Sequence, residues 1–254
     1  MKYLSVGEAR DCPGLRLVLT EGMPGPWAEA AKAVLNFKGI EFIPVAQKAG
    51  EANEDLLDWT GQTTAPVAVL DNEPVRYTWL DILMLAERLA PLPALLPSDL
   101  EARALVLGLT REIAGEDGLG WNKRHLLLAP GMAMDEVPES TARMGAKYGW
   151  SEQALASAKG RICEILAYFS KRLQSQAAAG SAYVVGEEIS AVDVFLANFI
   201  GMFAPLPESL NPMPDFLRNL YTENDPEIVA LIDGTLLAHR DQMYRDHLKT
   251  PLEF

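Results

Sequence analysis

The chain has 254 residues, which is enough for one large domain or two smaller ones, each with its own core. Apolar residues make up 49% of it, as in soluble globular proteins, and the net charge of −13 argues against nucleic acid or an anionic membrane surface as a partner. The two cysteines are far apart and the three histidines are scattered. We therefore expect no disulfide framework, no metal, no membrane span and a cytoplasmic location.

The first third of the chain alternates strand and helix signals. Apolar β-branched runs and helical periodicity predict strands at 15–19, 41–45 and 66–70, a short strand near Val75, and helices at 28–38, 53–59 and 78–89. Thr78 and Asp81 form a capping pattern at the start of the last helix. Ala65-Pro66 stands directly before a strand and is a candidate cis peptide bond.

The turn between the first strand and the first helix, residues 22–27, is built from two glycines, two prolines, a methionine and a tryptophan. Gly25 suits an N-cap and Pro26 suits the first helical position. A strand that leads into a helix N-terminus often carries a reactive thiol, a hydroxyl or a phosphate cradle. This turn contains no Cys, Ser or Tyr, and Thr20 is the nearest hydroxyl.

Residues 91–97 contain three prolines and are predicted to be a linker between a first domain, 1–90, and a second, 98–254. All segments after the linker have helical patterns. Ser98 is predicted to cap a helix with an apolar stripe at Leu100, Ala104, Leu105 and Leu107. Further helices are predicted at 121–128, 151–176, 192–203 and 226–244, and the segment 130–150 is predicted to be a loop with at most a short helix. The fold class is therefore an α/β domain followed by an all-α domain.

A second capping pattern precedes the most apolar predicted helix. Gly186 is followed by Ser190 and Asp193, so Ser190 can cap the helix while Asp193 accepts from the Ser190 backbone N–H. Because the helix that follows is apolar on all sides, we expect it to be the central buried helix, and we expect both polar residues to be structural.

The order of these motifs resembles the glutathione S-transferase superfamily over roughly residues 14 to 245. The matching residues are Thr64-Ala65-Pro66-Val67 for the cis-proline strand, the helix start at Thr78, and the tract from Gly186 to Asp193 for the buried capping box. The tract 25–35 looks like the first helix of omega-type members. The resemblance implies a thioredoxin-like N-terminal domain, a helical C-terminal domain, a homodimer, and glutathione as co-substrate without a metal.

The resemblance also assigns glutathione-binding residues one by one. It implies that the Ala65 backbone pairs with the cysteinyl part of glutathione and that Thr78 holds the γ-glutamyl carboxylate. Tyr77 replaces the usual Glu or Gln, and Gly25 stands at the omega-type cysteine position. The full predicted set is Thr20 as the catalytic candidate, with Gly25, Trp27, Lys48, Gln62, Ala65, Pro66, Tyr77 and Thr78 for glutathione.

The helix at 121–128 supplies the candidates for the second-substrate pocket. They are Trp121, Asn122, Arg124 and His125, and in the family the corresponding helix faces the glutathione site. The alternative interpretation is an ordinary helix face. Cys12 precedes the first strand and Cys163 lies beside an apolar helix stripe, so we expect no redox role for either.

Two functions remain open from the sequence. The first is an enzyme that conjugates glutathione to a small hydrophobic electrophile or exchanges it with one. Such enzymes lower the thiol pKa, because a hydrogen bond to sulfur and a helix N-terminus both favour the thiolate. The second is a non-catalytic binding or interaction module that has lost the thiol-activating residue, as the composition of the turn suggests.

Overall fold

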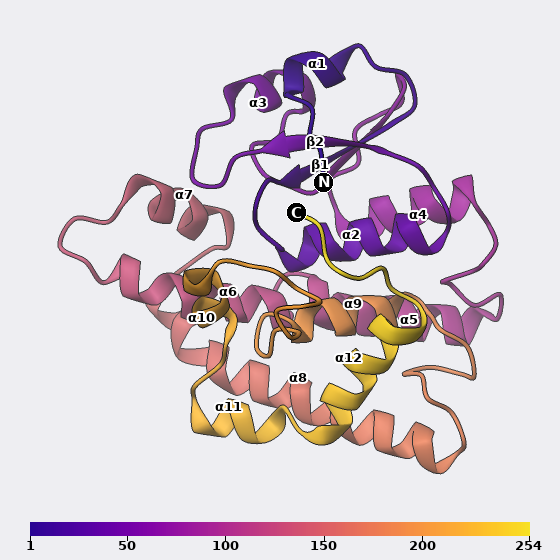
Figure 1. The fold of residues 1–254 in the computed structure, drawn as a ribbon. Helices are drawn as coiled ribbons and strands as arrows, with labels where there is room; N and C mark the ends of the chain where they lie inside the picture. The colour runs from indigo at the N-terminus through magenta and orange to yellow at the C-terminus, as the bar shows by residue number, and fades with distance from the viewer. The chain divides into compact units, whose positions relative to one another are not determined.

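The computed structural model describes all residues from 1 to 254, and the chain divides into two compact units (Figure 1). The first unit comprises residues 1–95 together with 207–213 and 247–254. The second comprises 96–206 and 214–246. The first boundary falls within the proline-rich segment 91–97, and two segments from the C-terminal part of the chain belong to the first unit.

A three-stranded mixed sheet forms the centre of the first unit. The strands are β1 (Leu15–Thr20), β2 (Ile43–Gln47) and β3 (Val67–Leu70), in the order β2-β1-β3, with β2 parallel and β3 antiparallel to β1. The predicted fourth strand near Val75 is wrong, because only a bridge between Arg76 and Ala68 forms. Pro74 has no N–H to donate, and a helix begins three residues after Arg76, so the strand has no room to extend.

Helices cover the sheet of the first unit. They are α1 (Val6–Arg10), α2 (Pro26–Phe37), α3 (Glu54–Thr60) and α4 (Trp79–Leu89). Val18 and Val45 pack with Leu56 of α3 and Ala9 of α1 in one apolar cluster, while α2 packs against α4. Helix α1 was not predicted, although its capping box of Ser5 and Glu8 is present in the sequence.

The C-terminal segment of the chain packs on α2. The buried Nζ of Lys32 donates to Glu29 Oε1 at 2.7 Å and to the backbone oxygen of Glu253 at 2.6 Å. Burial raises the pKa of Glu29, and the positive charge of Lys32 opposes this effect. A cavity of about 490 Å³ lies beside this contact, between the second half of α2 and residues 249–253. It contains none of the predicted site residues.

The second unit is entirely helical. Its helices are α5 (Leu100–Ala114), α6 (Leu119–Met132), α7 (Glu139–Lys147), α8 (Glu152–Ala178), α9 (Ala191–Ile200), α10 (Asp215–Tyr221), α11 (Pro226–Leu231) and α12 (Gly234–Asp246). Helix α8 buries an apolar stripe with helical spacing from Ala158 to Leu173, while Leu155, which the spacing also predicts on this face, is half-buried. Every residue of α9 is buried, as predicted. No helix in either unit has the length and hydropathy that crossing a bilayer requires.

Asp193 organises the start of α9. Its carboxylate accepts hydrogen bonds from the backbone N–H and the hydroxyl of Ser190 at 2.9 and 2.8 Å, and from the backbone N–H of Val184 at 2.7 Å. His239 of α12 lies 3.0 Å from the same carboxylate through Nε2. Because Asp193 is fully buried, these partners replace the water that it would otherwise bind, and the predicted capping box is confirmed.

Two details of the helical prediction are wrong. Asp99, not Ser98, caps α5, and Leu100 is 77% exposed, because the buried face of α5 is formed by Val106, Leu109 and Ile113. The predicted helix 226–244 is two helices. Asp233 interrupts it by accepting backbone hydrogen bonds at the start of α12, as a capping residue does.

Candidate functional site

Several predicted residues lie where β1 and β2 end. Thr20 and Gln47 are partners in the parallel register, and the Thr20 hydroxyl donates to Gln47 Oε1 at 2.8 Å. The Gln47 amide donates to the Lys48 carbonyl at 2.8 Å and contacts the Thr63 carbonyl at 3.5 Å. Gln47 therefore connects β1 and β2 to the loop that precedes β3. The sequence signal for Gln47 is a polar residue that ends an apolar strand.

The peptide bond between Ala65 and Pro66 is cis, as predicted. Val67 pairs with Val18 in the antiparallel register, and continuing this register brings Ala65 level with Thr20. Pro66 is buried and Ala65 is half-buried. The backbone of Ala65 thus lies at the same end of the sheet as Thr20.

The turn from β1 to α2 closes by backbone hydrogen bonds. Gly25 donates its N–H to the Met23 carbonyl at 2.9 Å and is the N-cap of α2, and Pro26 occupies the first helical position, as predicted. Since Pro26 has no N–H, Trp27 and Ala28 provide the next backbone donors of the first turn. The positive end of the α2 dipole therefore lies beside this turn without any charged or hydroxyl side chain between residues 22 and 27.

Thr78 is the N-cap of α4, and its hydroxyl is engaged by Asp81. It donates to the Asp81 carboxylate at 2.6 Å and accepts from the Asp81 backbone N–H at 3.1 Å. The bridge between Arg76 and Ala68 brings Thr78 level with Pro66, at the same end of the sheet as Thr20. Tyr77, the preceding residue, is 53% exposed. The Asp81 carboxylate therefore lies at the helix start where the resemblance places the γ-glutamyl carboxylate of glutathione.

Lys48 and Gln62 flank this end of the sheet in two loops. Lys48 is exposed, and its backbone N–H and carbonyl bond the side chain of Asn53 at 3.0 and 2.9 Å. The Gln62 backbone N–H donates to the Thr60 hydroxyl at 3.2 Å. These bonds fix the loop backbones, while the roles of both side chains toward a ligand stay predictions.

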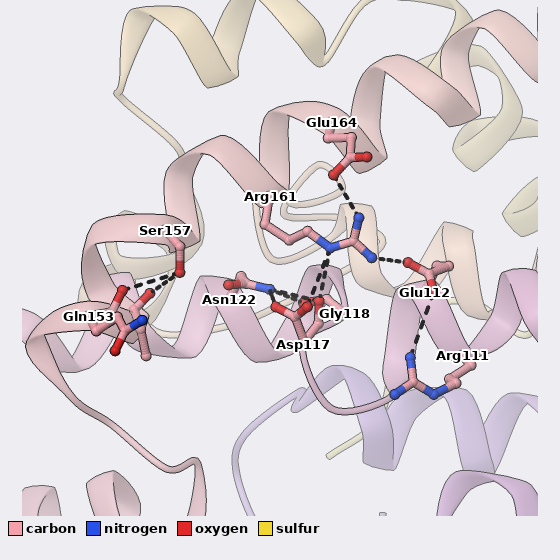
Figure 2. Close-up of polar contacts among 10 residues, drawn as sticks. Arg111, Glu112, Asp117, Gly118, Asn122, Gln153, Ser157, Arg161 and Glu164 are labelled. Carbon is pink, nitrogen blue, oxygen red and sulfur yellow. Dashed lines mark hydrogen bonds and ion pairs between the residues drawn. The ribbon is translucent and has the colours of Figure 1, made fainter.

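In the second unit, a polar network fixes the turn before α6 (Figure 2). Asn122 donates to the backbone oxygens of Asp117 and Gly118 at 2.9 and 3.0 Å. Arg161 of α8 pairs with Asp117, Glu112 and Glu164. Asn122 is therefore occupied in holding the turn, and this turn sets where Trp121 and Arg124 lie.

Trp121 and Arg124 meet a residue that sequence reasoning missed, Tyr148 at the end of α7. The indole N–H of Trp121 donates to the Tyr148 carbonyl at 2.9 Å, and the two rings meet edge to face at 4.7 Å. Two tyrosines, Tyr148 and Tyr221, act electrostatically on the guanidinium of Arg124. Burial acts to lower the pKa of Arg124, but these two tyrosines outweigh it and raise the pKa.

Lys147 lies beside the ring of Tyr148, and His125 is a separate buried residue of α6. Burial of the amine, followed by the positive charge of Arg124, lowers the pKa of Lys147 to about 8. The Lys147 amine lies 5.6 Å from the ring centre of Tyr148. His125 is buried, its Nδ1 has no hydrogen-bond partner, and burial lowers its pKa. No local pattern links Arg124 to Lys147 or Tyr221, which is why the sequence did not reveal these electrostatic interactions.

Neither unit contains a group of three or more His, Cys, Asp or Glu side chains that could hold a metal ion. Burial raises the pKa of the Cys163 thiol, which makes it a weaker nucleophile at neutral pH. The chemistry available at the end of the sheet is therefore that of backbone N–H groups, Thr20, Gln47 and Thr78.

A small mixed sheet with a cis-proline before its third strand, in a chain that continues into a helical unit with a buried capping box, is the architecture of the glutathione S-transferases. Solved structures agree. The beta-etherase LigF of Sphingobium sp. strain SYK-6 is 17% identical, with a TM-score of 0.63 over 91% of this chain and 95% of that one. A glutathione S-transferase from Xanthobacter autotrophicus Py2 is 18% identical, with a TM-score of 0.57 over 92% and 95% of the two chains.

A glutathione S-transferase from Methylobacterium radiotolerans JCM 2831, solved in complex with glutathione sulfonate, is 19% identical, with a TM-score of 0.56 over 94% of this chain and 97% of that one. No protein-family model and no curated protein matches the chain. At these identities the likeness establishes the fold. The chain has the glutathione S-transferase fold, and the resemblance drawn from the sequence is confirmed at that level.

Proposed function

We propose that the protein binds glutathione along the end of the sheet formed by Thr20, Ala65 and Thr78, and conjugates it to a small hydrophobic electrophile or exchanges it with one. The observation that carries this proposal is that all three residues lie at the same end of the sheet. Thr78 lies two strand spacings from Thr20, about 10 Å, and a fully extended tripeptide spans about 10 Å. A tripeptide can therefore reach from the start of α4 to the turn before α2.

In this arrangement the γ-glutamyl carboxylate lies at Thr78, and the cysteinyl backbone pairs with Ala65. The sulfur then faces the N-terminus of α2, where the helix dipole and the first-turn N–H groups favour the thiolate. Thr20 already donates its hydroxyl proton to Gln47. Activation of the thiol would therefore rest on the backbone of α2 rather than on a side chain.

Two further features of the proposal come from the family. The structural neighbours include a glutathione S-transferase solved with glutathione bound, which supports glutathione as the ligand. We also propose a homodimer and a helical C-terminal domain that holds the electrophile. Exposed apolar residues on α4, Leu80 and Leu89, support the dimer, because such residues are commonly covered in assemblies.

A second candidate function is a binding module without catalysis. The Asp81 carboxylate, 2.6 Å from the Thr78 hydroxyl, repels a second carboxylate at that position, and the turn before α2 supplies no hydroxyl or thiol to the sulfur. Both features weaken glutathione binding and activation relative to a site without them.

Calorimetric titration of glutathione, with thiolate absorbance followed at pH 7 and turnover of 1-chloro-2,4-dinitrobenzene measured in parallel, tests the proposal. Binding with thiolate formation and turnover supports the enzyme. Binding without thiolate formation or turnover supports the module. Absence of binding overturns the glutathione proposal in both forms. S-methylglutathione is the control, since it offers the same peptide but no thiol to ionise.

A further inference from the structure

We propose that the cavity between α2 and residues 249–253 binds a short apolar peptide with free ends, for which a dipeptide zwitterion is the simplest ligand. The volume of the cavity, about 490 Å³, is within the range that holds small organic ligands. All of its walls belong to the first unit, and none of them contains a residue of the proposed glutathione site. The peptide site is therefore separate from that site and does not depend on the proposed function.

Three segments of the chain form the walls of this cavity. Lys32 and Asn36 are one turn apart on α2, so they lie on one face of the helix. Gly39, with a φ of 65°, turns the chain after α2, and residues between 40 and 44 form the second wall. Residues 249–253 form the third wall, beside α2 (Figure 1). A ligand in the cavity therefore contacts segments that are far apart in the sequence.

Part of the cavity lining is apolar. Ile40, Phe42 and Leu252 are half-buried, so each of these side chains keeps some apolar surface in contact with water. Phe42 and Pro44 are two residues apart along an extended segment, which places them on the same face of it. Covering such surface with the apolar side chains of a ligand is favourable because it removes apolar area from water.

Lys32 supplies a buried hydrogen-bond donor to the cavity. The residue is 5% exposed, and its ammonium donates to Glu29 Oε1 at 2.7 Å and to the backbone oxygen of Glu253 at 2.6 Å. A lysine ammonium has three N–H donors, so these two bonds leave one N–H for a ligand. An oxygen acceptor, such as a peptide carbonyl or a carboxylate, is the group that this donor requires.

The exposed charges on the cavity walls are of both signs. Lys249 is cationic, whereas Glu41 and Glu253 are anionic. A ligand with a charge of one sign would be repelled by part of this set, while a zwitterion finds a partner for each of its two charges. Because these side chains come from two separate walls, a ligand whose own charges stand apart suits them. The ammonium and carboxylate of a dipeptide are separated in this way.

Three of the lining side chains are available for such a ligand. Asn36, Glu41 and Lys249 form no side-chain hydrogen bond or ion pair within the chain. The Asn36 amide has both a donor and an acceptor, so it can pair with the C=O and the N–H of a peptide bond. Glu41 then remains for the ammonium and Lys249 for the carboxylate. A free amino acid has both charges but lacks the peptide bond, and a fatty acid lacks the ammonium as well.

Three forms of one dipeptide test the site: leucyl-phenylalanine with free ends, its N-acetyl form and its C-terminal amide. Each is titrated calorimetrically into the full chain at pH 7 without glutathione. We expect the free dipeptide to bind at least about threefold more tightly than either capped form, the ratio expected for one partly exposed ion pair.

Two variants assign the ends of the ligand. Glu41→Gln should reduce the loss of affinity that acetylation causes, and Lys249→Gln should reduce the loss that amidation causes. Both residues are exposed, so we expect both variants to fold, and thermal melting checks this. The matched controls are Glu188→Gln and Lys171→Gln, two exposed residues of the second unit, and they should leave both ratios unchanged.

Absence of binding of the free dipeptide overturns the site, and so does equal binding of its three forms. A folded Glu41→Gln or Lys249→Gln variant that keeps its own ratio also overturns it, because the dipeptide then binds outside the cavity. Failure of the protein to bind glutathione overturns the proposed function and leaves the peptide site standing. Glutathione binding without dipeptide binding does the opposite.

Discussion

The hydroxyl of Thr20 donates a hydrogen bond of 2.8 Å to the side-chain oxygen of Gln47, which is buried at the end of the neighbouring strand. Thr20 is the hydroxyl residue nearest in sequence to the turn where glutathione transferases place their activating residue. Its proton is directed along the sheet end toward Gln47. For Thr20 to stabilise a thiolate, this bond would have to break and leave a buried amide oxygen unpaired.

Replacing Thr20 with Val therefore separates a structural from a catalytic role. We expect the free energy of unfolding in urea to fall by about 1–3 kcal/mol, because Gln47 loses its partner. The thiol pKa of bound glutathione should not change, since the backbone of α2 stabilises the thiolate. If the Thr20 hydroxyl donates to the glutathione sulfur instead, its removal would lower kcat by about 100-fold or more. That result would assign the activation to Thr20.

Replacing Asp81 is predicted to increase the affinity for glutathione. Asp81→Asn removes the negative charge beside the Thr78 hydroxyl and keeps an oxygen that can accept its proton. Glutathione affinity should rise about threefold to tenfold at low salt, because like charges near the helix start no longer repel. Asp215→Asn, in the first turn of α10, is the control and should leave affinity unchanged. An unchanged affinity in Asp81→Asn would place the γ-glutamyl carboxylate elsewhere.

Much of the fold was predictable because local patterns and tertiary packing agree. The α8 stripe, the caps at Gly25 and Thr78, and the box of Ser190 and Asp193 all depend on short-range spacing, and all are confirmed. The α5 stripe was not, because Leu100 and Val106 are equally apolar and only the tertiary contacts decide which one is buried.

The candidate site divides in the same way. The sheet end follows from the strand order, so Thr20, Ala65 and Thr78 could be placed together from the sequence. The contact of Trp121 with Tyr148 could not, because the two residues are 27 positions apart and no periodic pattern marks an indole N–H that donates to a distant carbonyl. Long-range polar contacts of this kind are visible only in the folded chain.

The buried cap of α9 predicts a large loss of stability from a single carboxylate. Asp193→Ala removes partners from Ser190, Val184 and His239 at once, so we expect the free energy of unfolding to fall by more than about 3 kcal/mol. Asp99→Ala removes an exposed cap at the start of α5 and should cost only about 1 kcal/mol. Equal losses in urea unfolding would show that burial adds nothing to the cap.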